Sequence, residues 1–172
     1  MSRQSEVIII FGSSRSDGNT MKLLKAIVDK HDVKIVNLKD LNISFYDYNH
    51  QNNKDDFLPL IQTIVQYKKI VFASPVYWYS FSAQMKTFID RFSDLLTIEK
   101  DLGRLLKGKS AYLISSGSDL HYPQCFEDQF RLTCEYLDLL YSGIHYGSFP
   151  STSELTPEQI QAAKAFGQKI FN

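Results

Sequence analysis

Short apolar runs alternate along the chain with segments whose apolar residues recur at helical spacing. The runs predict strands at Val7–Phe11, Lys34–Leu38, Lys69–Ala73, Ser110–Ser115 and Ile144–Phe149. The helical spacing predicts helices at about Asn19–Lys30, Phe57–Tyr67, Ala83–Leu96 and Pro123–Tyr141, and a closing helix from Pro157. Strands that alternate with helices are typical of an α/β domain wound on both faces of a parallel sheet.

The segments between these elements predict little regular structure. Asn42–Lys54 is polar and aromatic without a clear period, and Asp101–Lys109 is a connector with two glycines. Thr156 and Gln159 form a capping box before the closing helix, which we expect to bury Ile160, Ala163 and Ile170. Since no linker, repeat or low-complexity segment interrupts the pattern, residues 1–172 are predicted to form a single domain.

Composition excludes several classes of function. The chain of 172 residues has 19 basic and 19 acidic side chains, so bulk charge favours neither a nucleic-acid partner nor a membrane surface. We see no signal peptide and no apolar run long enough to cross a membrane. Cys125 and Cys134 lie nine positions apart in one predicted helix and cannot pair there. A reduced, cytoplasmic setting is therefore expected.

The segment Gly12–Thr20 has the features of an anion-binding loop. It comes after a strand predicted to be buried on both faces, and it leads into a helix whose N-terminus carries partial positive charge. Serine and threonine hydroxyls can donate from this loop, and the guanidinium group of Arg15 is suited to phosphate. A polar turn that happens to contain an arginine is the simpler alternative.

Known phosphate-binding motifs narrow the choice. A P-loop needs four residues between its glycines and then a lysine, whereas five residues separate Gly12 from Gly18 and Asn19 stands in the place of the lysine. The dinucleotide motif is absent. A phosphatase loop would need a cysteine nucleophile, and a response regulator a carboxylate at the end of the first strand. The remaining interpretation is a loop that holds a terminal phosphate without reacting with it.

Two further loops are expected to meet this one at the carboxyl edge of the sheet. Ser74–Ser82 is dense in aromatic rings, and Ser115–Pro123 begins with small residues that permit close backbone approach. Rings can pack on a flat heterocycle while backbone groups bond its edge. Phosphate at one end and a flat ring system at the other describe a mononucleotide such as FMN. The alternative for the aromatic residues is an apolar cap at a subunit contact.

Two motifs carry a family resemblance. The sequences G-S-S-R-S-D-G-N-T at Gly12–Thr20 and S-P-V-Y-W-Y-S-F-S-A-Q-M-K-T-F-I-D-R-F at Ser74–Phe92 resemble those of the flavodoxin-like NAD(P)H-dependent FMN reductases, also called multimeric flavodoxin-type oxidoreductases. The resemblance extends over nearly the whole chain. It implies a five-stranded flavodoxin-like parallel sheet in the order 2-1-3-4-5, with helices on both faces and FMN at its carboxyl edge.

The resemblance also implies a set of cofactor-binding residues. Those implied at the FMN phosphate are Ser13, Arg15, Asn19 and Thr20, with Ser14 close by; those along the flavin ring are Pro75, Val76, Tyr77 and Trp78; those at its pyrimidine side are Ser115, Ser116 and Gly117. Family members are usually homodimers or homotetramers. A related branch carries an iron–sulfur cluster, for which two cysteines are too few.

The function implied by this resemblance is that of an NAD(P)H oxidoreductase in which electrons pass through FMN to a quinone, azo compound, nitroaromatic or second flavin. Because the cofactor carries the chemistry, we assign no catalytic side chain. His121 is a candidate proton donor, although a surface or structural role is expected for each of the four histidines. A flavodoxin-type electron carrier and an FMN-binding interaction protein are the alternatives. Balanced charge disfavours the carrier, which would dock through acidic side chains. The sequence does not distinguish NADH from NADPH.

Overall fold

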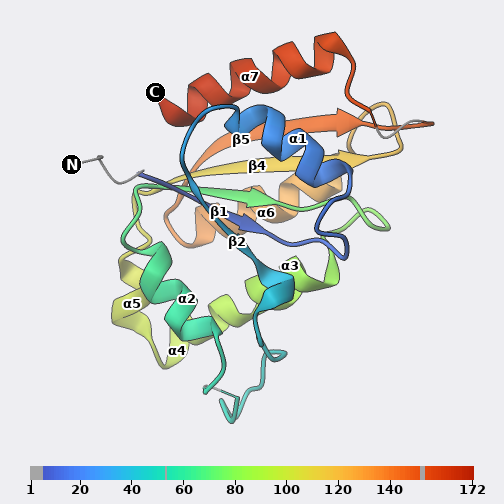
Figure 1. The fold of residues 1–172 in the computed structure, drawn as a ribbon. Coiled ribbons are helices and arrows are strands. Elements are labelled where there is room, and N and C mark those ends of the chain that lie inside the picture. The colour runs from blue at the N-terminus through green and yellow to red at the C-terminus, as the bar shows by residue number, and fades with distance from the viewer. Residues whose placement is uncertain (1–5, 53, 152–153) are drawn as a thin grey trace.

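A computed structural model of the chain describes residues 6–52, 54–151 and 154–172. Five parallel strands form one sheet in the order β2-β1-β3-β4-β5, which confirms the predicted flavodoxin-like topology (Figure 1). The strands are β1 (Val7–Phe11), β2 (Lys34–Asn37), β3 (Lys69–Ala73), β4 (Ser110–Gly117) and β5 (Leu140–Ser148).

Helices cover both faces of this sheet. Helices α1 (Asn19–Val28) and α7 (Pro157–Phe171) pack on one face (Figure 1). The other face carries α2 (Phe57–Ile64), α3 (Ala83–Asp90), α4 (Asp94–Thr97), α5 (Lys100–Arg104) and α6 (Gln124–Tyr136), with the 3-10 turns η1 (Leu38–Asp40) and η2 (Arg91–Ser93).

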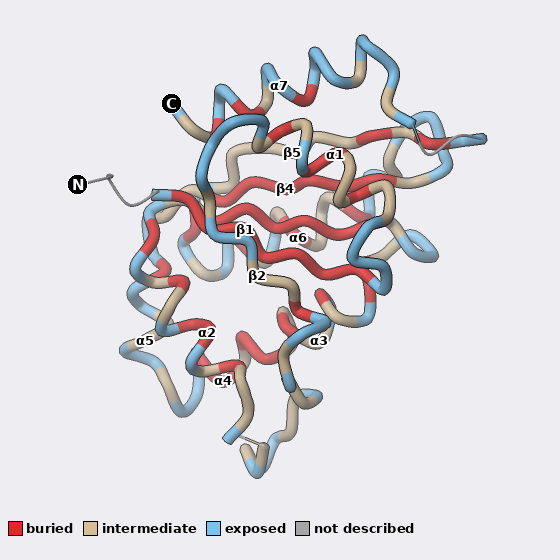
Figure 2. Tube along the Cα trace, viewed as in Figure 1, coloured by how far each residue is buried: buried red, intermediate tan, exposed pale blue. Residues whose placement is uncertain are grey.

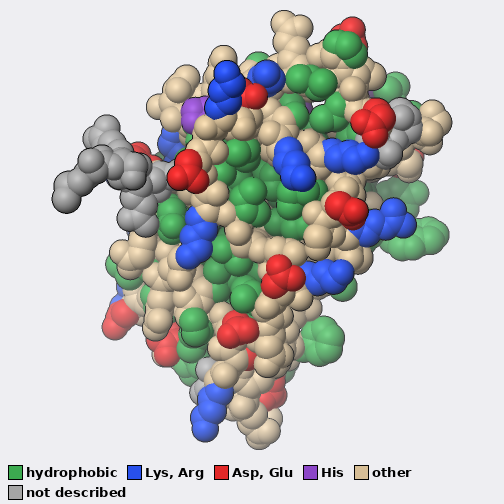
Figure 3. Space-filling model, in the orientation of Figure 1, with side chains coloured by type: hydrophobic (Ala, Val, Ile, Leu, Met, Phe, Trp, Pro, Cys, Tyr) green, Lys and Arg blue, Asp and Glu red, His purple; other side chains and the backbone are tan. Residues whose placement is uncertain are grey.

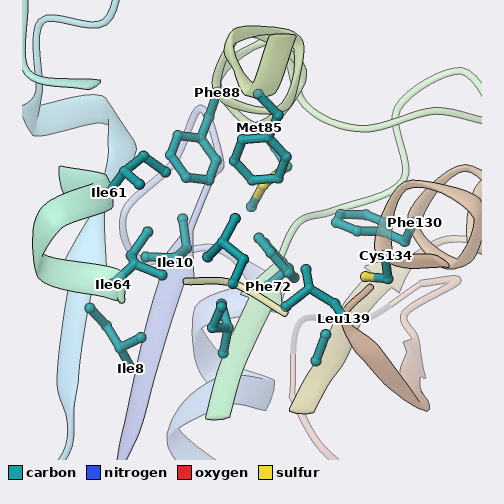
Figure 4. Close-up of a cluster of buried hydrophobic side chains, with 14 of the residues drawn as sticks. Ile8, Ile10, Ile61, Ile64, Phe72, Met85, Phe88, Phe130, Cys134 and Leu139 are labelled. Atoms are coloured by element: carbon teal, nitrogen blue, oxygen red, sulfur yellow. The ribbon is translucent and has the colours of Figure 1, made fainter. Parts of the chain in front are cut away.

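The central strands are buried on both faces, as their continuous apolar runs predict (Figure 2). Because side chains alternate along a strand, Ile8 and Ile10 of β1 face the α2–α3–α6 side, while Val7, Ile9 and Phe11 face α1 and α7. Figure 4 shows the first of these cores, where side chains of the sheet meet those of three helices. Burial on both sides fixes the strands that position the loops at their ends.

Several predicted boundaries were wrong for local reasons. The helix expected over Pro123–Tyr141 ends at Tyr136, because Asp138 adopts the left-handed conformation (φ 56°) and the Leu139 N–H bonds the Cys134 carbonyl. Tyr141 therefore belongs to β5. The connector Asp101–Lys109 contains most of α5.

The helix predicted over Ala83–Leu96 is divided into α3, η2 and α4. The capping box of α7 is confirmed, and Ala163 and Ile170 are buried as expected. Ile160, however, is 37% exposed, so it does not belong to the core. Helical spacing predicted the face of α7 that packs on the sheet, but it did not predict that Ile160 in the first turn is partly exposed.

A buried arginine anchors the loop between η1 and α2. Arg91 is fully buried, and its Nε donates to Asp94 Oδ2 at 2.7 Å, while Nη1 donates to Asp55 Oδ2 at 2.5 Å and to the Ser44 carbonyl at 3.2 Å. His50 Nδ1 lies 2.9 Å from the second oxygen of Asp94. Three of these contacts join residues 36 to 47 positions apart, so the predicted loop is held at several points despite its lack of helix or strand.

The charges of this network make a prediction about acid stability. Burial by itself would raise the pKa of Asp55, but hydrogen bonds from Arg91 and from the N–H groups of Ser44 and Phe57 hold that pKa below its ordinary value. The folded protein therefore gains stability from ionised Asp55 at neutral pH and loses it as the pH falls below about 4, toward the lowered pKa.

We expect Asp55→Asn to lower the free energy of unfolding by about 3 kcal/mol at neutral pH, since it removes one partner of a buried ion pair. The deficit should shrink as the pH falls below about 4. Urea denaturation at several pH values measures this. The matched control is Asp101→Asn, whose pair with Arg104 is solvent-exposed and contributes at most about 1 kcal/mol. Equal effects of both substitutions would contradict the assignment.

Candidate functional site

Three loops start from the same edge of the sheet because β1, β3 and β4 are in parallel register. Phe11 pairs with Ala73, and Ala73 pairs with Ile114. Backbone hydrogen bonds continue beyond the strand ends, from Gly12 N to the Ala73 carbonyl at 2.9 Å and from Val76 N to the Ser116 carbonyl at 2.9 Å. The predicted convergence of the three loops is therefore observed.

Buried hydroxyl groups then lock these loops together. Ser82 Oγ donates to the Gly12 carbonyl at 2.8 Å and accepts from Met85 N, so one side chain caps α3 and holds the first loop. Ser74 Oγ accepts from Ser82 N, and Ser115 Oγ donates to the Ser74 carbonyl at 2.7 Å. An unpaired buried carbonyl is costly, so this geometry is strongly determined.

The loops enclose a cleft of about 360 Å³ at the carboxyl edge. Its floor is polar, because the hydroxyls of Thr20 and Ser116 lie 2.7 Å apart and bond each other across two loops. The lining residues are Ser13, Arg15, Gly18, Asn19 and Thr20 from the first loop and α1, Pro75, Val76 and Tyr77 from the second, and Ser116, Gly117, Ser118 and Phe149.

One end of the cleft is built to receive an anion. Helix α1 starts at Asn19 with Gly18 as its N-cap and has no side-chain cap, whereas Ser82 caps α3 and Thr156 caps α7. The first N–H groups of a helix lack intrahelical acceptors and carry partial positive charge. With the exposed guanidinium of Arg15 beside them, they form a site for phosphate.

A second hollow of about 240 Å³ continues the cleft, since both are lined by Val76, Gly117 and Ser118. We call this second hollow the ring slot. Its other lining residues are Trp78 and Tyr79 on one side, Asp119 on the other, and Tyr146 from β5. Cleft and ring slot together form a continuous site that is polar at the α1 end and aromatic at the other.

The aromatic wall of the ring slot is a strained hairpin. Tyr77 and Ser80 form an antiparallel bridge, and the two residues between them adopt left-handed conformations, with φ of 50° at Trp78 and 64° at Tyr79. Such φ values are unfavourable for large side chains and concentrate at functional sites. Gln129 of α6 supports the hairpin by accepting a hydrogen bond from Ser80 Oγ at 3.1 Å.

The hairpin presents its rings to solvent rather than to the core. Trp78 is 93% exposed and Tyr79 is 60% exposed. Figure 3 shows hydrophobic side chains projecting at the right edge of the molecule, where Figure 1 places the loop between β3 and α3. A backbone held in this conformation, with exposed rings beside a hollow, is suited to contact with a flat ligand or a second protein surface.

The structure brings most of the predicted residues together. Those that line the cleft are Ser13, Arg15, Asn19, Thr20, Pro75, Val76, Tyr77, Ser116 and Gly117, and Trp78 lines the ring slot. Ser14 and Ser115 line neither hollow. Ser14 is exposed, and its carbonyl accepts from Lys39 Nζ at 3.3 Å, while Ser115 is fully buried with its hydroxyl on the Ser74 carbonyl.

Other lining residues were not predicted. Tyr79, Ser118 and Asp119 stand inside the two loops that the sequence singled out, so their neighbourhood indicated them. Tyr146 comes from the last strand and Phe149 from the position just after that strand, where nothing in the pattern marks a site. Strand order is the cause of their position there, because β5 lies next to β4 at the edge of the sheet.

Three histidines have structural contacts. His31 stacks on Phe171 with ring centroids 4.2 Å apart, His145 stacks on Phe166 at 5.3 Å, and His50 bonds Asp94. Burial lowers the pKa of His145, which favours its neutral form. His121 lies in the loop after β4 and does not line either hollow.

A larger hollow of about 510 Å³ lies away from this edge, between α4, α5 and the end of α6, and none of the predicted residues lines it. Among the described residues, no three His, Cys, Asp or Glu side chains are grouped as metal ligands. Among the same described residues, no helix has the length and apolar character needed to cross a membrane.

Comparison with known proteins agrees with this geometry. A family model described as NADPH-dependent FMN reductase matches residues 5–150. YwqN of Bacillus subtilis (strain 168), named as a putative NAD(P)H-dependent FMN-containing oxidoreductase, is 32% identical over an alignment of 122 residues that covers 66% of this chain and 67% of that protein.

Two solved structures share the fold. A Bacillus subtilis protein described as Trp repressor binding protein superposes with a TM-score of 0.74 at 25% identity, over 92% of this chain and 94% of that one. An FMN-dependent NADH-azoreductase from Bacillus anthracis, solved with FMN, superposes with a TM-score of 0.70 at 11% identity, over 96% of this chain and 99% of that one.

The hydroxyl of Ser82 provides a test of how the site is held. We expect Ser82→Ala to lower the free energy of unfolding by about 1–3 kcal/mol, because it strands the Gly12 carbonyl and the Met85 N–H in a buried place. Urea denaturation measures the change. Ser142→Ala is the control, since that hydroxyl makes an exposed bond to the Leu140 carbonyl. A loss at Ser82 no larger than at Ser142 would show that the hydroxyl link is dispensable.

Proposed function

The chain belongs to the NADPH-dependent FMN reductase family, and we propose that it binds FMN in the cleft and ring slot and uses it to pass electrons from NAD(P)H to a small aromatic acceptor. The observation that carries the proposal is the continuity of the two hollows. A phosphate site without a side-chain cap leads directly into an aromatic slot, which is the order of groups along FMN.

The residues present fit the phosphate end of FMN. Arg15 supplies a permanently charged donor fork, and the start of α1 supplies backbone N–H groups. Ser13 and Thr20 add hydroxyls, of which the first accepts from Arg15 N and the second bonds the Ser116 hydroxyl. Lys39 Nζ, on the Ser14 carbonyl, adds a second cation to this loop. We propose that Ser13, Arg15, Asn19 and Thr20 hold the phosphate.

The residues also fit the ring end. The N–H groups of Val76 and Tyr77 are already taken by the carbonyls of Ser116 and Ser80, so these two residues line the site without donating to the ring. Recognition of the ring therefore falls on the hairpin tip at Trp78–Tyr79 and on residues 117–119. Small and backbone groups on one side, with rings on the other, leave space for a flat heterocycle.

Bound FMN would supply the hydride and electron transfer, and the protein positions the reactants. Trp78, Tyr79, Tyr77 and Leu120 are exposed beside the ring slot or in its flanking loops, so an incoming ring would meet apolar and aromatic surface. This surface favours flat acceptors, and we propose quinones, azo compounds, nitroaromatics or a free flavin as the class. A homodimer or homotetramer is proposed as well, since exposed rings beside a site are typical of subunit contacts.

An anaerobic reduction tests the proposal. The protein is loaded with FMN, freed of excess, and mixed with NADPH while the visible flavin absorbance is followed. We expect stoichiometric FMN and bleaching within seconds. Bound flavin that stays oxidised with both NADPH and NADH would favour the electron-carrier or interaction-protein alternative. Failure to retain FMN would contradict the assignment of the cleft.

Arg15→Met tests the phosphate end separately. We expect the Kd for FMN to rise roughly ten- to hundredfold, because a charge-assisted phosphate contact is lost. The Kd for riboflavin, which has no phosphate, should stay unchanged, and flavin fluorescence measures both. Arg104→Met is the control, since Arg104 is exposed and lies by the hollow between α4 and α5. Equal losses of affinity for FMN and for riboflavin would contradict the assignment of Arg15 to the phosphate end.

A further inference from the structure

The side chain of Tyr146 enters the ring slot from β5, whereas the other lining residues belong to the loop after β3, the end of β4 and the loop after β4. Its backbone pairs with Ser115 in the sheet. Its hydroxyl donates to the Asp119 carbonyl at 2.9 Å, across 27 positions of sequence. The edge strand β5 thus holds the turn 117–119, which begins at the last residue of β4 and whose residues Ser118 and Asp119 are exposed.

The Tyr146 hydroxyl lies directly against Gly117. A Cβ atom built on Gly117 would lie 2.6 Å from the Tyr146 hydroxyl oxygen and 3.4 Å from the nearest ring carbons. The first distance is too short for any side chain without movement, whereas the second is an ordinary close contact. A larger residue at this position would therefore require the tyrosine hydroxyl to move, whereas the backbone conformation of Gly117 is not one that favours glycine.

The ring of Tyr146 packs against a second tyrosine ring. Tyr122 packs edge-on against it, with ring centroids 5.7 Å apart and planes at 63°. Burial raises the pKa of Tyr122, and a hydrogen bond with Glu127 raises it further. Glu127 also accepts a hydrogen bond from the Tyr141 hydroxyl at 2.9 Å. The ring contact with Tyr122 limits the movement of Tyr146.

Burial, followed by the nearby charge of Asp119, raises the pKa of Tyr146. The phenol therefore remains protonated at neutral pH and keeps donating to the Asp119 carbonyl. Its role in this geometry is directional, since it fixes where the turn stands relative to the hairpin at Trp78–Tyr79.

We propose that Tyr146 is a positioning residue for the flavin ring: seated over Gly117 and bonded to the Asp119 carbonyl, it holds the 117–119 turn as one wall of the ring slot. This inference rests on the proposed function, because it presumes that FMN is the occupant. By this inference the width of the ring slot depends on Tyr146 of β5, which lies outside both of the motifs that carry the family resemblance.

Tyr146→Phe removes the hydroxyl and keeps the ring. We expect the Kd for FMN and the Kd for riboflavin to rise together by roughly three- to tenfold, as the loss of one hydrogen bond would give. The Kd for inorganic phosphate, measured by calorimetric titration, should not change, because the α1 end of the cleft is untouched. Ser142→Ala is the control, since it removes a hydroxyl from the same strand that bonds the Leu140 carbonyl away from the slot.

A double-mutant cycle tests the contact between the Tyr146 hydroxyl and Gly117. Gly117→Ala should weaken FMN binding in the wild-type background, where the new methyl group meets the hydroxyl. In the Tyr146→Phe background the same substitution should cost severalfold less, because the nearest remaining atoms are 3.4 Å away. If the effects of the two substitutions on the Kd for FMN are additive, contact between the Gly117→Ala methyl group and the Tyr146 hydroxyl is not the cause of the weaker binding.

The outcomes separate the inference from the function on which it rests. If wild-type protein binds and reduces FMN but Tyr146→Phe binds flavins as tightly as Ser142→Ala does, only the role of Tyr146 is overturned. A parallel loss of flavin and phosphate affinity in Tyr146→Phe would show general disruption of the fold, which also overturns it. If wild-type protein retains no FMN, both the function and the inference fail.

Discussion

The site depends on buried hydroxyl groups that bond the backbone of neighbouring loops. Parallel strands bring three loops to one edge, but their carbonyls would be left without partners once packed there. Ser82 bonds the Gly12 carbonyl and Ser115 bonds the Ser74 carbonyl, so each loop is fixed to the next. Thr20 and Ser116 add a bond between α1 and the end of β4. Cleft and ring slot exist because these contacts determine one arrangement.

This rigidity permits strain where the ligand is expected. Trp78 and Tyr79 hold left-handed backbone conformations at the tip of a two-residue hairpin, which bulky residues rarely adopt. Bonds to Gln129 on one side and to the Ser116 carbonyl on the other keep the hairpin in place. The opposite wall has no such strain and depends instead on Tyr146. The two walls of the slot are thus fixed by different means.

Much of the fold could be predicted, because burial on both faces produces continuous apolar runs and helices repeat at their own period. The family resemblance supplied the strand order and most of the cleft residues. Ends of elements could not be predicted in the same way, since the left-handed Asp138 that ends α6 is set by local backbone geometry. The Arg91 network joins segments 36 to 47 residues apart, which no local pattern reveals. Ser115, which was expected beside the flavin, is buried with its hydroxyl on the Ser74 carbonyl, and Tyr146, for which nothing was predicted, lines the ring slot.

The central claim is that FMN occupies the cleft and ring slot and no other hollow of the molecule. The most direct measurement is a nuclear magnetic resonance titration of isotope-labelled apo-protein with FMN, followed through backbone amides and the Trp78 indole. We predict the largest shifts at Asn19 and Thr20, at residues 117–119 and at Trp78. Shifts confined to the larger hollow around Leu96, Gly103 and Tyr136 would contradict the account.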